Sequence, residues 1–172
     1  MELDFNRSLT CCFTGHRLLS DAKAALLLEA LFKQIRLLHT ERGYSNFLCG
    51  GAVGFDQLAA EAVLALRSEY PAMRLYLLMP FPGYDKDWAD WQRAARDAVL
   101  READGSLYTA DAYFRGVYYR RDRMLVHLSS VCVAYLQRNA GGTFYTASYA
   151  DDCKHEIINL ANELPKVYNN VY

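Results

Sequence analysis

The stretch Gly50-Gly51-Ala52-Val53-Gly54-Phe55-Asp56 decides the fold that we expect for this chain. It follows the apolar run 44–49 and opens the helix-like run 58–66. A strand that turns through glycines into a helix directs unpaired backbone N–H groups, and the positive end of the helix dipole, at one spot. That spot attracts anions, phosphates above all. The stretch therefore predicts a site that holds a phosphorylated small molecule.

Short apolar runs alternate with longer helix-like runs along the rest of the chain. This alternation is typical of an α/β domain with a mainly parallel sheet and helices on both faces, and we expect residues 1–172 to form one such domain. We expect Ser20-Asp21 to cap the first helix and Gly43 to end it. Strands are predicted at residues 9–14, 45–49, 73–79, 106–108 and 131–136, the last being the most central. Helices are predicted at residues 24–39, 58–66, 87–101 and 113–128, with a last helix from the loop 139–143 to about residue 164 and an edge strand at 165–168.

The composition is that of an ordinary globular domain. Of the 172 residues, 52% are hydrophobic and 23% are charged, and a chain of this length buries roughly 70% of the surface that it exposes when unfolded. No run of 18 apolar residues is present, and the acidic N-terminus lacks the basic start of a signal peptide. We therefore expect a cytoplasmic protein with no membrane partner. The five cysteines form no C-x-x-C motif, so we expect them to be reduced core residues.

Charge and motif content argue against several function classes. A formal net charge of −1 gives no overall attraction to nucleic acid, so we do not expect a nucleic-acid partner and any anion binding must be local. The four histidines and the scattered acids show no metal-ligand spacing, so we expect no metal site and no required cofactor. Signatures of a catalytic serine or cysteine are also absent from the sequence. Thirteen tyrosines, crowded in the second half, favour helix–sheet packing or a subunit interface.

Four short motifs follow predicted strands. In open parallel sheets, ligands bind outside the carboxyl ends of the strands, where loops from different strands converge. We therefore expect the motifs to meet at one ligand. They are Thr14-Gly15-His16-Arg17, the stretch Gly50 to Asp56, Pro80-Phe81-Pro82-Gly83 and Gly141-Gly142-Thr143.

Each glycine motif has a purely structural alternative. The glycines of the first stretch allow a phosphate to approach the backbone closely, and the alternative is a tight turn that binds nothing. Cys49 occupies the first position of a G-x-G-x-x-G fingerprint, and no Gly-Lys-Ser/Thr follows, so neither a nicotinamide fingerprint nor a P-loop is predicted. Asp56 either caps the helix, the role that we favour, or meets a ribose hydroxyl. The stretch Gly141 to Thr143, with Thr146 on the same helical face, is a second phosphate nest or equally a loop whose threonine caps the helix.

Two arginines are candidate phosphate ligands. His16 and Arg17 directly follow a strand and should emerge at its rim, where an arginine suits bidentate phosphate contact. A surface ion pair is the alternative for Arg17. Arg121 lies in a basic cluster interrupted by Asp122, which ordinarily indicates a solvated helix face. We would expect Arg121 to bind the ligand only if it lies close to the glycine turns.

Together these motifs resemble those of the YpsA-like bacterial family of unknown function, within the SLOG superfamily of Rossmann-like domains that is related to the DprA and LOG proteins. The resemblance covers nearly the whole chain and depends on five ordered motifs. They are Thr14-Gly15-His16-Arg17; Gly50-Gly51-Ala52-x-Gly54-x-Asp56-Gln57 with Ala59-Ala60-Glu61; Pro80-Phe81 with Trp88; Arg121 with Val126 and Ser129; and Gly141-Gly142-Thr143 with Thr146 and Tyr149-Ala150.

The resemblance implies a three-layer α/β/α Rossmann-like fold, a site for a nucleotide or nucleotide-derived ligand with the glycine turns on phosphate, and a homo-oligomer. LOG hydrolases carry a glutamate near the position of Thr146, and a threonine cannot supply its carboxylate. We therefore expect ligand sensing without catalysis and assign no catalytic residue. A nucleotide N-glycosidase that uses Asp56, Glu61 or His16 is the alternative, and DprA-like binding of single-stranded DNA is a lesser one. The predicted ligand-binding residues are Gly15, His16, Arg17, Gly50, Gly51, Gly54, Asp56, Pro80, Phe81, Arg121, Gly141, Gly142, Thr143 and Thr146.

Overall fold

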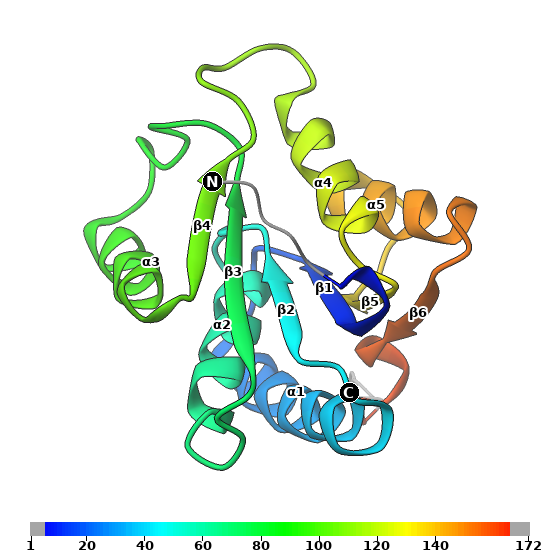
Figure 1. The fold of residues 1–172 in the computed structure, drawn as a ribbon. Coiled ribbons are helices and arrows are strands. Elements are labelled where there is room, and N and C mark those ends of the chain that lie inside the picture. Colours follow the sequence, from blue (N-terminus) through cyan, green and yellow to red (C-terminus); the bar gives the residue numbers. More distant parts are fainter. Residues whose placement is uncertain (1–5, 166–172) are drawn as a thin grey trace, which may run out of the picture.

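A computed structural model describes residues 6–165 and contains a six-stranded sheet with the order β4-β3-β2-β1-β5-β6 (Figure 1). Every neighbouring pair in this sheet is parallel. The predicted α/β, Rossmann-like fold with a parallel sheet is therefore confirmed. The strands are β1 Thr10–Gly15, β2 Asn46–Cys49, β3 Arg74–Met79, β4 Gly105–Tyr108, β5 Val131–Tyr135 and β6 Glu156–Asn159. The helices are α1 Asp21–Arg42, α2 Phe55–Leu66, α3 Asp90–Glu102, α4 Val117–His127 and α5 Gly141–Asp152, with short 3₁₀ turns at Arg7–Leu9 and Leu160–Asn162.

Two apolar layers cover the two faces of the sheet. Because successive strand residues point to opposite faces, Cys11 and Phe13 of β1 enter one layer and Cys12 between them enters the other. Helices α1, α2 and α3 supply side chains to the first layer, and α4 and α5 supply side chains to the second. This explains why the middle residues of the inner strands are apolar: these strands are buried on both sides. All five cysteines are free, and four of them are buried.

The ends of α1 are formed as expected. The Ser20 side chain accepts a hydrogen bond from the Lys23 backbone N–H, and Gly43 adopts a left-handed conformation with φ of 75°. Gly116, like Gly43, has a left-handed backbone conformation, and it precedes the first residue of α4. Its φ of 96° is a conformation that side chains disfavour, so the predicted helix 113–128 begins only at Val117.

The C-terminal part of the chain differs from the prediction. The last helix ends at Asp152 instead of continuing to about residue 164, and β6 forms in its place. Ile157 packs into the layer of α4 and α5, while Ile158 packs into the layer of α1, α2 and α3. Adjacent β-branched residues that serve opposite faces require a strand, and the helical prediction was wrong here. The edge strand predicted at 165–168 falls, apart from residue 165, outside the described residues.

The middle of the sheet is also different from the prediction. Strands β1 and β2 lie at its centre, whereas β5 is separated from the edge only by β6. Residues of β5 are nevertheless fully buried, because α4 and α5 cover one face of the sheet and the layer of α1, α2 and α3 covers the other. The parallel arrangement brings the carboxyl ends of β1, β2 and β5 to the same edge, which is where the predicted motifs emerge.

Candidate functional site

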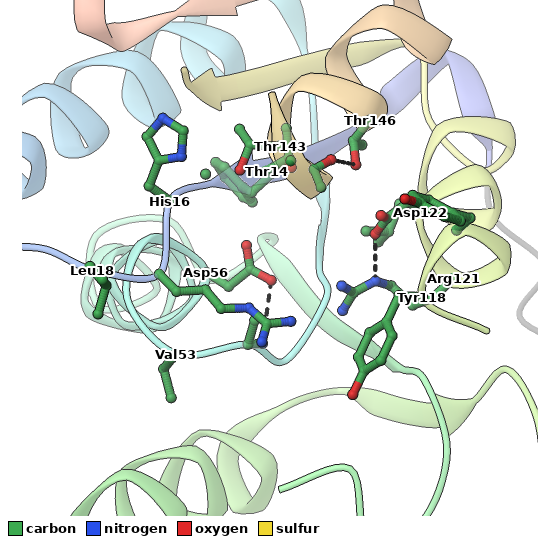
Figure 2. A pocket seen from close by; sticks show the side chains of 18 of the residues that line it. Thr14, His16, Leu18, Val53, Asp56, Tyr118, Arg121, Asp122, Thr143 and Thr146 are labelled. Carbon is green, nitrogen blue, oxygen red and sulfur yellow. Dashed lines mark hydrogen bonds and ion pairs between the residues drawn. The ribbon is translucent and has the colours of Figure 1, made fainter. Parts of the chain in front are cut away.

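A cavity of about 800 Å³ lies at the carboxyl ends of the central strands. Its walls come from the end of β1 and the segment that follows, the start of α2 with the turn before it, Trp88 before α3, helix α4, and the start of α5 with the loop before it. Figure 2 shows Thr14 and Thr143 on one side of this space, Asp56 and Val53 on another, and Tyr118 with Arg121 and Asp122 on a third. The cavity is therefore built from five parts of the chain that are separated in sequence.

Three helices begin at this cavity without a side-chain cap. Helix α2 follows Gly54, α4 follows Gly116 and α5 follows Ala140, and none of these residues accepts a capping hydrogen bond. Away from the cavity, the Ser20 side chain caps α1. Helix α3 follows Ala89, which also has no side-chain cap, although the backbone N–H of Ala89 donates to the Gln92 side chain. The first N–H groups of an α-helix have no intrahelical acceptor, and the helix dipole places partial positive charge there. The first N–H of α2 donates to the His16 carbonyl and that of α4 to the Phe114 carbonyl. The three helix ends together still direct partial positive charge at the cavity, which favours anions.

Arg121 is a buried cation whose position is fixed by two partners. Its Nε donates to Asp122 Oδ1 at 2.7 Å, and its Nη1 donates to the Gly50 carbonyl. Burial alone would lower the pKa of Arg121, but Asp122 and Asp56 raise it above its ordinary value, so the cation is retained. No residue among 6–165 accepts from Nη2, and Arg121 lines the cavity. One face of a pre-positioned guanidinium is thus available to a ligand.

Asp56 connects the cavity to the glycine turn. Its Oδ2 accepts from the backbone N–H groups of Gly50 at 3.1 Å and Ala52 at 3.3 Å, so it holds the turn instead of capping α2. The residue is only 7% exposed, and within residues 6–165 it forms no salt bridge with any cationic side chain. Burial raises the pKa of Asp56 from 3.8 to about 6, against the opposing effect of Arg121. The Asp56 carboxylate therefore already binds two backbone N–H groups of the glycine turn that we expected, from the sequence, to bind phosphate.

The glycines of the first stretch are required by close packing within the protein. A Cβ atom on Gly50 would lie 2.3 Å from Arg121 Nη1, and one on Gly54 would lie 2.3 Å from the Arg17 carbonyl oxygen. Gly54 also has a φ of 79°. In contrast, a Cβ atom on Gly142 would have nothing within 4 Å. Among the glycines that line the cavity, Gly116, Gly141 and Gly142 leave open space beside their backbone.

Threonine hydroxyls complete the wall around the start of α5. Thr14 and Thr143 are each 8% exposed and line the cavity, and neither hydroxyl has a hydrogen-bond partner in the described part of the chain. The Thr146 hydroxyl donates to the Gly142 carbonyl at 2.9 Å, so its hydrogen is used within the helix. These two hydroxyls are accessible from the cavity and are open to a ligand or to water.

His16 and Arg17 lie at the rim of the cavity. The His16 Nε2 accepts from the Gln137 backbone N–H at 2.9 Å and so joins the loops that follow β1 and β5. Burial, followed by the charge of Arg138, lowers the pKa of His16, which agrees with a neutral acceptor. Arg17 is exposed and stands 5.7 Å from the centre of the Tyr118 ring.

The cavity brings together nine of the fourteen predicted ligand-binding residues: Gly15, His16, Arg17, Asp56, Arg121, Gly141, Gly142, Thr143 and Thr146. Gly50, Gly51, Gly54, Pro80 and Phe81 do not line it. The Pro80 carbonyl accepts from Thr109 and Ala110, and the Phe81 ring packs against neighbouring tyrosines. These two residues therefore shape the loop beside the cavity.

Sequence reasoning did not assign Tyr118, Asp122 or Arg138 to the site, although all three line the cavity, as does Thr14 of the first predicted motif. Asp122 looked like part of a solvated charged face, yet it is 6% exposed and paired with Arg121. The period of the helix held a weak signal, because Asp122 lies one turn before Val126, which is buried. No cluster of three potential metal ligands occurs among residues 6–165, and none of the helices in that range is both long and apolar enough to cross a membrane.

Solved structures share the fold. DNA processing protein A (DprA) from Streptococcus pneumoniae superposes with a TM-score of 0.64 and 14% identity, over 94% of this chain and 52% of that one. DNA processing protein A from Helicobacter pylori, described with a unique single-stranded DNA binding mode, gives a TM-score of 0.63 and 18% identity, over 95% of this chain and 68% of that one. At these identities the likeness is one of fold.

Sequence comparisons identify the family. UPF0398 protein SH1465 from Staphylococcus haemolyticus is 31% identical over 124 residues, which are 70% of this chain and 66% of that protein. UPF0398 protein YpsA from Bacillus subtilis is 30% identical over 84 residues, which are 49% of this chain and 47% of that protein. These matches span about two thirds or less of each relative's length. The YpsA model, described as the YspA SLOG family, matches residues 12–160. The chain therefore belongs to the YpsA family of SLOG proteins.

Proposed function

We propose that the cavity binds a nucleotide or a nucleotide-derived phosphorylated small molecule and that binding is its whole function. The observation that carries this proposal is the convergence of three uncapped helix starts, those of α2, α4 and α5, on one cavity of about 800 Å³. This volume is in the range of small-molecule sites. Backbone N–H groups at helix starts are suited to phosphate oxygens.

The start of α5 supports the phosphate subsite best. Gly142 leaves its backbone accessible, the Thr143 hydroxyl has no protein partner in the described residues, and Arg121 offers Nη2 to the same cavity. In the turn that precedes α2, by contrast, the N–H groups of Gly50 and Ala52 already bind Asp56. We therefore place the phosphate at α5.

Binding without turnover is supported by the side chains on α5. Thr146 is buried and donates its hydroxyl hydrogen to the Gly142 carbonyl, and a threonine cannot replace a catalytic carboxylate. A sensor needs only a ligand-dependent change in stability or in assembly. The homo-oligomer expected from the sequence stays a prediction, and size-exclusion chromatography with light scattering tests it with and without nucleotide.

A thermal-shift panel tests the proposal directly. The panel contains nucleoside mono- and diphosphates, dinucleotides, ADP-ribose, cyclic nucleotides, inorganic phosphate and a single-stranded DNA oligonucleotide. A ligand that binds only the folded state adds about 2.7 kcal/mol at a hundred times its Kd. If none of the small phosphorylated molecules stabilises the protein, the proposal is wrong. Stabilisation by the oligonucleotide alone would favour DNA binding instead.

The variant Gly142→Ala distinguishes an effect on phosphate binding from an effect on folding. The added methyl group enters open space without strain, so the unliganded protein keeps or slightly gains stability. It also blocks close approach to the start of α5, and loss of one charge-assisted hydrogen bond weakens binding by about 10- to 100-fold. Ser148→Ala on the same helix, outside the cavity, is the matched control. If Gly142→Ala and wild type bound the nucleotide with equal affinity, the phosphate would not bind at the start of α5.

Hydrolysis of a nucleotide N-glycosidic bond is the second candidate function. It is favoured by the cavity-lining carboxyl of Asp56, because a pKa of about 6 suits a general acid. Incubation with nucleoside monophosphates, followed by chromatography for free base, tests it. Release of base by wild type, and its loss in Asp56→Asn, would establish this activity in place of simple binding.

A further inference from the structure

Two buried carboxylates present oxygens to the cavity that no protein group binds. Asp56 uses Oδ2 for the glycine turn, and within residues 6–165 its Oδ1 has no hydrogen-bond donor. Asp122 uses Oδ1 for Arg121, and its Oδ2 likewise has no donor within that range. The two residues are 7% and 6% exposed, and both line the cavity. Figure 2 shows one Asp56 oxygen pointing into the open space of the cavity while the other is bound.

These oxygens restrict what the cavity accepts. Both free oxygens are accessible from the cavity, so they can accept hydrogen bonds from a ligand. Asp56 has no salt-bridge partner in the described residues, so phosphate oxygens placed next to it would be repelled. A molecule that brings an anionic group to the start of α5 and hydrogen-bond donors to Asp56 and Asp122 therefore complements the cavity.

A hydroxyl group fits this position better than an amino group. Arg121 Nη2 lies in the same cavity without an acceptor, and Asp56 and Asp122 are its two carboxylate neighbours. A hydroxyl donates one hydrogen and accepts another, so it can satisfy a carboxylate and the guanidinium together. An ammonium group has no acceptor for Arg121. Two adjacent hydroxyls supply a donor to each carboxylate.

We propose that the cavity selects a phosphorylated ligand with a vicinal diol, as in the ribose of a ribonucleotide, and that Asp56 Oδ1 is the principal acceptor of the diol. This inference rests on the proposed function and specifies the ligand of that site. Asp122 accepts the second hydroxyl, and Arg121 donates to the diol oxygens. Asp56 then has two tasks, because one oxygen holds the glycine turn and the other recognises the sugar.

Paired ligands test the diol without changing the protein. Isothermal titration compares the four common ribonucleoside 5′-monophosphates with their 2′,3′-dideoxy counterparts, and ribose 5-phosphate with 2-deoxyribose 5-phosphate. Each pair has the same phosphate, and each nucleotide pair has the same base. We expect the ligand that lacks the diol to bind about 10- to 100-fold more weakly, the effect of losing one hydrogen bond to a charged group.

Asp56→Asn tests the residue. The amide oxygen can still accept from the glycine turn, so its NH₂ group faces the cavity where an acceptor is needed. We expect the preference for the diol to fall to within about threefold. Glu61→Gln is the control, because it removes an exposed carboxylate from the same helix outside the cavity. It should retain the full preference.

The outcomes separate the two proposals. Equal affinity for ribonucleotides and dideoxynucleotides would overturn the diol inference and leave phosphate binding intact. An unchanged diol preference in a folded Asp56→Asn variant would overturn the assignment to Asp56. Absence of binding by every ligand in both series would overturn the proposed function together with this inference.

Discussion

Asp56→Asn should remove a pH dependence that the buried carboxyl imposes on the free energy of unfolding. Burial raises the pKa of Asp56 from 3.8 to about 6, so the folded protein binds a proton at this site more tightly than the unfolded chain does. The favourable contribution is then complete below pH 3.8 and is lost as the pH rises through 6. Asp56 in the wild type therefore lowers the free energy of unfolding at neutral pH, relative to acid pH.

The size of this effect follows from the two pKa values. Each pH unit of difference is worth about 1.4 kcal/mol, so the interval from 3.8 to about 6 corresponds to about 3 kcal/mol in total. Roughly half of that lies between pH 5 and pH 7.5, where the protein is easier to study. Asparagine keeps the shape and an acceptor for the turn but does not titrate.

Urea unfolding of wild type and Asp56→Asn at a series of pH values measures the effect. Fluorescence of Trp88 and Trp91 reports unfolding. Subtracting the two free energies at each pH cancels every other titrating group that both proteins share. We expect wild type to lose about 1.4 kcal/mol relative to the variant between pH 5 and pH 7.5. A difference that stays flat, or one in which wild type gains stability with rising pH, would refute the reasoning that burial dominates at Asp56.

Two further predictions concern the glycine turn. Gly54→Ala should destabilise the protein by about 3 kcal/mol or more, because its Cβ atom would meet the Arg17 carbonyl oxygen at 2.3 Å, whereas Gly83→Ala, with φ of 80° and nothing within 4 Å, should lose only about 1–2 kcal/mol. Thermal unfolding of both variants checks this, and equal losses would show that backbone strain alone explains Gly54. Tyr84→Phe removes the hydroxyl that donates to the Gly51 carbonyl at 2.6 Å, and we expect a loss of about 1–3 kcal/mol in urea unfolding. An unchanged midpoint would mean that Tyr84 does not support the turn.

The architecture of the sheet could be predicted because its signals are local. Apolar runs of four to six residues, separated by helix-like runs, indicate strands that are buried on both faces, and parallel strands with helical crossovers follow from that. Ser20 and Gly43 marked the ends of α1 because capping chemistry depends on the residue itself. The same locality brought the motifs to one edge of the sheet, since carboxyl ends of parallel strands coincide.

The strand β6 could not be separated from a helix by its sequence alone. Residues 156–159 make a run of four, and a run that short fits a period of 2 or of 3.6 equally well. Pairing of Cys132 with Ile157 in the register of β5 and β6 decided the outcome. Hydrogen bonds to a neighbouring strand are long-range interactions, so they leave no mark within the segment itself.

The sequence by itself determined that a turn with glycines at positions 50, 51 and 54 opens a helix at the ligand edge of a parallel sheet. Only the tertiary structure decided what occupies the space that the missing side chains leave. Arg121, distant in sequence, fills the space beside Gly50, and the Arg17 backbone fills that beside Gly54. It also decided that Asp56 takes N–H groups of the turn and that Asp122 is buried, and for this reason we propose the phosphate subsite at the start of α5. The physical reason is that a glycine in the sequence indicates that no Cβ atom fits at that position, whereas the atoms that exclude the Cβ atom belong to other elements of the fold.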